Sequence, residues 1–131
     1  MMIRPQLSGI RILLVERHLV LSQAMAEYLS YLGAEVRTYH EPNEAFPVIS
    51  DFRPHLILCD LTFPEEAAFK ALARARQLSS EIDFKISVVG MSTLNAYAIE
   101  RRAFSAGFDG VLQKPFGPTD LVHLLARLLN R

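Results

Sequence analysis

Four polar residues stand at the ends of apolar runs, and their types suit phosphoryl transfer. Glu16 and Asp60 each follow such a run directly, Ser92 closes a third, and Lys114 follows a fourth. If the runs are parallel strands, their carboxyl ends line one crevice, which is where ligands bind in open α/β sheets. A carboxylate there can take a phosphoryl group, while a hydroxyl and an ammonium bind its oxygens. We therefore expect these four side chains to form one site.

Size and composition are those of an ordinary folded domain. The chain has 131 residues, 50% of them hydrophobic, which suits one core and excludes disorder. No apolar run approaches the roughly 20 residues of a membrane span. The formal net charge is zero and the basic residues are scattered, which argues against direct nucleic-acid binding. The lone cysteine, Cys59, lies in an apolar run and is expected to be a buried hydrophobe; without an internal disulfide, the cytoplasm is the expected compartment.

Short apolar runs alternate five times with longer amphipathic segments. This order predicts a parallel sheet covered by helices on both faces, with right-handed crossovers. The predicted strands are residues 10–15, 34–39, 55–59, 85–90 and 108–113, and four of the predicted helices are residues 19–32, 65–79, 94–106 and 118–130. The remaining helix should start near Pro42, but Pro47 follows within two turns and would break a regular helix. We expect that helix to begin beside Pro47 or to bend there.

Five landmarks in this order resemble the receiver domain of response regulators. They are the strand ending in Glu16, the segment Asp60-Leu-Thr-Phe-Pro64, Ser92, Ala106-Gly107 and Lys114-Pro115-Phe116. The resemblance runs from about residue 10 to 129, and residues 1–131 are taken as a single receiver-like domain. It implies a doubly wound, flavodoxin-like (βα)5 fold with a five-stranded parallel sheet of order 2-1-3-4-5.

The resemblance also implies a role for each site residue. Asp60 would accept a phosphoryl group from a sensor histidine kinase or a phosphotransfer protein, Lys114 would bind its oxygens, and Ser92 would be the switch hydroxyl. The Lys114–Pro115 peptide would be cis. Magnesium would take oxygens from an acid pair at positions 16 and 17, from Asp60 and from the backbone carbonyl of Thr62.

Arg17 departs from this pattern, because it occupies the position of the second acid. A guanidinium offers no oxygen ligand and stays charged, so magnesium binding should be weak or absent. Arg17 either points into water or pairs with Asp60 or Glu16, and we expect the pair. Val111 is a second departure, because relatives carry an aromatic residue there.

The predicted function is that of a signalling receiver and not of an enzyme. Either Asp60 is phosphorylated and switches protein contacts, or the chain is a pseudo-receiver that binds or dimerises without phosphorylation. The expected output face, which could also form a homodimer, is the fourth helix, fifth strand and fifth helix, with Tyr97, Arg101, Val111 and Pro118. Residues 100–102 are expected to be a solvated helix face.

A small phosphatase or a flavin-binding enzyme is a remote alternative on the same fold class. The chain after Glu16 lacks a hydroxyl- and glycine-rich phosphate loop, as a flavin-binding protein would need. Thr62 stands where a phosphatase of this kind would have its acid/base carboxylate.

Overall fold

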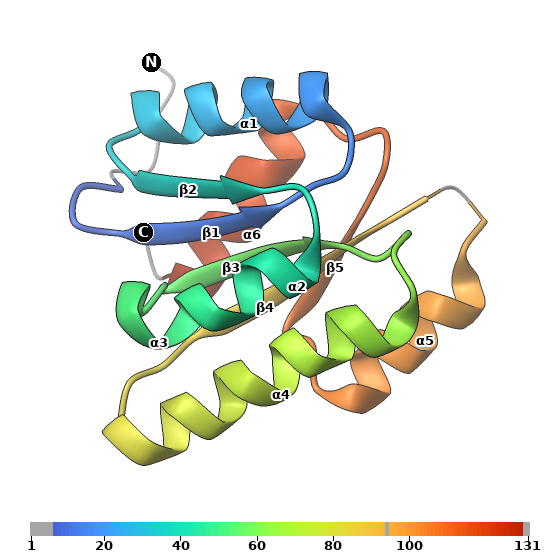
Figure 1. The fold of residues 1–131 in the computed structure, drawn as a ribbon. Coiled ribbons are helices and arrows are strands. Elements are labelled where there is room, and N and C mark those ends of the chain that lie inside the picture. The colour runs from blue at the N-terminus through green and yellow to red at the C-terminus, as the bar shows by residue number, and fades with distance from the viewer. Residues whose placement is uncertain (1–6, 94, 130–131) are drawn as a thin grey trace.

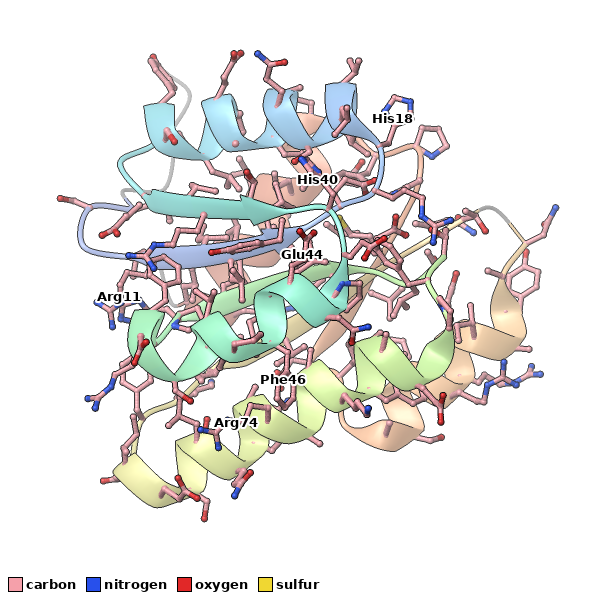
Figure 2. The ribbon with its side chains drawn as sticks, in the orientation of Figure 1. Arg11, His18, His40, Glu44, Phe46 and Arg74 are labelled. Atoms are coloured by element: carbon pink, nitrogen blue, oxygen red, sulfur yellow. The ribbon has the colours of Figure 1, made fainter. Side chains whose placement is uncertain are left out.

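The sheet of the computed structural model, which describes residues 7–93 and 95–129, has the predicted topology. Five parallel strands lie in the order β2-β1-β3-β4-β5. Figure 1 shows the sheet crossing the molecule between two layers of helices. The strands are β1 (Arg11–Val15), β2 (Glu35–Tyr39), β3 (Leu56–Asp60), β4 (Ser87–Ser92) and β5 (Gly110–Gln113). The parts of the predicted domain at residues 1–6 and 130–131 lie outside the described residues.

Two clusters of buried side chains, one on each face of the sheet, hold the helices in place. Helices α1 (Leu19–Tyr31) and α6 (Pro118–Leu129) pack on one face, through residues such as Leu29 and Leu125. The short helices α2 (Pro42–Ala45) and α3 (Ile49–Phe52), with α4 (Glu65–Ile82) and α5 (Tyr97–Ala106), cover the other. Strand β3 is buried throughout, as the all-apolar run before Asp60 predicts.

Pro47 interrupts the second helical segment, as predicted. The chain forms α2, then one 3₁₀ turn over Phe46–Val48, then α3. Pro42 lies in the first turn of α2, where its missing N–H costs nothing. Pro47 has no N–H to donate to a helical hydrogen bond, so the 3₁₀ turn replaces regular α-helix at this position.

Two helix boundaries differ from the prediction. Helix α4 continues to Ile82 and ends at Asp83, which takes the left-handed conformation at φ 52°. Helix α5 begins at Tyr97, later than predicted, and Asn95 before it is also left-handed, at φ 65°. The predicted start at residue 94 lies outside the described residues. A loop therefore separates Ser92 from α5.

Gly90 is a point of close approach behind the site. A Cβ added there would lie 2.4 Å from Cδ1 and 2.8 Å from Cγ of the buried Leu61, the residue after Asp60. Contacts this short force the leucine to move.

We expect Gly90→Ala to lower the free energy of unfolding by about 1–3 kcal/mol, the usual cost of overpacking a core. Urea denaturation measures the loss. Gly117→Ala is the matched control, because a Cβ at Gly117 meets no atom within 4 Å. Equal free energies of unfolding for the two variants would show that Leu61 moves aside without a loss of stability.

Candidate functional site

The four predicted side chains lie at one edge of the sheet, as expected. Glu16 directly follows β1, Asp60 ends β3, Ser92 ends β4, and Lys114 directly follows β5. All five strands are parallel, so these positions share the carboxyl edge. The sheet thus gathers residues that are far apart in the sequence.

Lys114 is the centre of this site. Its Nζ lies 2.5 Å from Oε1 of Glu16 and 3.5 Å from Oδ2 of Asp60. Both carboxylates are buried, with side-chain exposures of 0% and 2%, against 19% for Lys114. Two buried charges of like sign repel, and the ammonium offsets that repulsion. The ion pairs therefore make the two-carboxylate arrangement possible.

Backbone amides fix the other oxygen of each carboxylate. The N–H of His18 donates to Oε2 of Glu16 at 2.7 Å, and the N–H of Thr62 donates to Oδ1 of Asp60 at 2.9 Å. Hydrogen bonds to an ionised acceptor are among the stronger ones in proteins. Each carboxylate is therefore held between an amide and the same lysine.

Ser92 is bonded to Glu100, a residue to which the sequence analysis gave no role in the site. Its Oγ donates to Oε2 of Glu100 at 2.7 Å, and its carbonyl accepts from the N–H of Lys114 at 2.7 Å. The prediction that Glu100 belongs to a solvated helix face is wrong, because its carboxylate turns to Ser92; Arg101 and Arg102 are exposed. Helix α5 is capped at Ala96, so Ser92 is not its N-cap.

Arg17 does not make the ion pair that we predicted. Its side chain is exposed, and its guanidinium carbon lies 4.4 Å from the centroid of the Phe63 ring. Within residues 7–93 and 95–129, no ion pair joins Arg17 to Asp60 or Glu16. Lys114 already pairs with both carboxylates, and the aromatic face attracts the cation without requiring its burial.

The Lys114–Pro115 peptide is cis, as expected. A cavity of about 420 Å³ opens beside the lysine, between the loops that follow β1, β4 and β5. Its lining residues are His18, Leu21, Thr93, Lys114, Pro115 and Phe116. Lys114, the partner of both buried carboxylates, thus also lines a mostly apolar cavity.

Residues 12–126 match the family described as response regulator receiver domain. This chain is a receiver domain of the response regulator family. It is 31% identical over 122 residues to the transcriptional regulatory protein CrdR of Helicobacter pylori, covering 92% of this chain and 55% of CrdR. The chain therefore spans about half the length of this curated relative.

Solved structures of receiver domains have the same fold. One is the receiver domain of the sensor histidine kinase PA1611 from Pseudomonas aeruginosa, which was solved with magnesium coordinated in its active-site cleft. Its sequence is 25% identical to this chain, and the TM-score is 0.78. The match covers 95% of this chain and 100% of that one. Another is the Saccharomyces cerevisiae receiver domain of Ssk1 with the phosphotransfer protein Ypd1, at 18% identity and TM-score 0.80, covering 97% and 91% of the two chains.

The residues present in this receiver domain fit magnesium poorly. Glu16 and Asp60 each bond an amide with one oxygen, while Lys114 lies against the other. Magnesium requires near-octahedral oxygen ligation. In the described part of the chain, no group of three or more His, Cys, Asp or Glu residues could hold a metal ion. The charge that a dication would supply comes instead from the lysine.

Cys59 packs directly behind the site, as a buried side chain next to Asp60. Burial, together with the negative charges of Asp60 and Glu16, raises the pKa of its thiol from 9.0 to about 12. The thiol therefore stays protonated and unreactive at neutral pH, which confirms its interpretation as a buried hydrophobe.

No described helix is both long enough and apolar enough to span a bilayer.

Removing the lysine should destabilise this domain. We expect Lys114→Met to lower the free energy of unfolding by about 3 kcal/mol or more at pH 7, because it leaves two buried carboxylates without a cation. Urea denaturation of the variant measures this cost.

Asp60→Asn in the Lys114→Met background is the matched control. Removal of one carboxylate should recover part of the loss, so the double variant should be more stable than the sum of the single effects predicts. Additive effects would show that Lys114 and Asp60 do not interact.

Proposed function

We propose that this receiver domain accepts a phosphoryl group on Asp60 and does so with little help from magnesium. The observation that carries this proposal is the cluster of Asp60, Glu16 and Lys114, in which a buried acceptor carboxylate lies beside a fixed cation. Membership of the receiver family supports a regulatory role in two-component signalling. Because the chain belongs to this family, we do not pursue the alternatives of a small phosphatase or a flavin-binding enzyme.

The transfer step forms one bond and breaks one. An oxygen of Asp60 attacks the phosphorus of a phosphohistidine, the P–N bond breaks, and the imidazole keeps the electron pair and takes a proton from solvent. The ammonium of Lys114 moves from the carboxylates to the equatorial phosphoryl oxygens, whose charge it offsets. The N–H of Thr62 keeps the carboxylate oriented during the attack.

The donor in this proposal is a histidine kinase or a phosphotransfer protein. The donor imidazole would approach through the cavity that Lys114 lines, and Lys114 pairs with Asp60. Output would run through α5, β5 and α6, where Tyr97, Arg101 and Pro118 are exposed and Val111 is half-buried. We also propose that this face binds an output domain or protein or forms a homodimer. Residues 1–131 would be a single domain that works in the cytoplasm.

A second candidate is a pseudo-receiver that works without phosphorylation. The observation favouring it is that Lys114 already neutralises the site, while Arg17 replaces an oxygen ligand. In that version the charge cluster is permanent, and the same output face binds its partner in one fixed conformation.

Acetyl phosphate tests the acceptor directly. We expect the wild type to gain the mass of one phosphate, with only a weak dependence on magnesium, and Asp60→Asn to gain none, as measured by intact mass. Phosphate on the Asn variant would remove Asp60 from the mechanism. No phosphate on either protein would favour the pseudo-receiver.

Arg17→Asp tests the poor metal fit. The substitution adds an oxygen ligand and removes a cation, so we expect magnesium affinity to rise about tenfold or more, measured by calorimetry or NMR titration.

Arg17→Gln is its matched control, because it removes the charge without adding a carboxylate. We expect it to bind magnesium much less tightly than Arg17→Asp. Equal affinity of wild type and Arg17→Asp would show that position 17 does not control the metal.

A further inference from the structure

Ser92 can donate only one hydrogen bond from its hydroxyl, and Glu100 already receives it. The Oγ–Oε2 distance is 2.7 Å, and Ser92 is buried at 1% exposure. A hydroxyl carries a single proton, so a second acceptor can be served only if the first is released. Bonds to an ionised acceptor are stronger than neutral ones, so the release has a real cost.

The strand pairing places Ser92 at the same edge of the sheet as the proposed acceptor. Asp60 and Met91 are partners in the β3–β4 ladder, and Ser92 is the next residue at the same edge. Side chains alternate along a strand, so Ser92 lies on the face of Val88, whose cluster includes Ala103 of α5. Ser92 therefore shares the sheet edge with Asp60 and lies on the face that α5 covers.

Glu100 lies in the first turn of α5, and its carboxylate joins this turn to Ser92 at the end of β4. The N–H of Glu100 donates to the carbonyl of Ala96, and Ala96, the N-cap residue, provides no side-chain hydrogen bond to the helix. The glutamate also favours the helix start electrostatically, because the first turn carries partial positive charge. Loss of the Ser92 bond should loosen the start of α5.

We propose that Glu100 is a latch: it competes with a phosphoryl group on Asp60 for the Ser92 hydroxyl, and so couples the site to the position of α5. This inference rests on the proposed function. Without phosphate, the latch holds Ser92 on Glu100 and α5 against the sheet. A phosphoryl group offers a stronger acceptor, takes the hydroxyl and frees the first turn of α5. Glu100 is thus a positioning residue that sets how readily the domain switches.

Hydrogen exchange in the unphosphorylated protein tests the latch itself. Glu100→Ala should speed amide exchange at Arg101 and Arg102 about tenfold, as should Ser92→Ala, and the double variant should exchange no faster than either single one. Glu81→Ala on α4, where the carboxylate bonds only the exposed Gln77 among the described contacts, is the control and should leave these amides unchanged. Unchanged exchange in Glu100→Ala, or additive effects, would overturn the latch.

A shortened acid separates the hydrogen bond from the helix charge. Glu100→Asp keeps the negative charge at the helix start but lacks the reach to Ser92, so it should exchange like Glu100→Ala. Glu100→Gln keeps an acceptor oxygen in place and should fall between wild type and Glu100→Ala. Wild-type exchange in Glu100→Asp would assign the effect to charge alone and would overturn the proposal.

Phosphorylation tests the competition. At a limiting concentration of acetyl phosphate, Glu100→Ala should carry about tenfold more phosphate on Asp60 than the wild type, because its hydroxyl is free to bind the new group. Equal or lower phosphorylation of Glu100→Ala would overturn the competition. No phosphate on either protein would end the acceptor proposal and the competition with it, while hydrogen exchange would still decide whether the latch exists.

Discussion

The ion pairs of Lys114 with Glu16 and Asp60 are the interaction on which the rest of the site depends. Two carboxylates buried side by side are unstable unless a cation lies between them. The sheet order explains why that cation is carried on a long side chain: β5 is separated from β3 by β4, and the stem has to cross the gap. Once the ammonium is in place, the amides of His18 and Thr62 can fix the outer oxygens.

This arrangement explains the different behaviour of the two cations at the site. Lys114 is mostly buried and neutralises the carboxylates, whereas Arg17 stays exposed on the ring of Phe63. The site therefore has a fixed cation and lacks an acid where magnesium would need one. Under the proposed function, Asp60 would therefore accept a phosphoryl group with less dependence on magnesium.

The features that could be predicted from the sequence are those that depend on the local pattern of apolar and polar residues. Apolar runs located the strands, and strand ends located Glu16, Asp60, Ser92 and Lys114, because parallel strands bring such ends to one edge. The partner of Arg17 was mispredicted, because the choice between a carboxylate and the Phe63 ring depends on where Lys114 lies in three dimensions. The Glu100 contact was missed for a related reason: it depends on the late start of α5 after the left-handed Asn95.

A high-resolution crystal structure grown with abundant magnesium would show which cation occupies the site. We predict that the Lys114 ammonium remains between Glu16 and Asp60, that Arg17 remains on Phe63, and that no octahedral ion binds there. A magnesium ion bound to both carboxylates at about 2.1 Å, with Lys114 displaced, would contradict it.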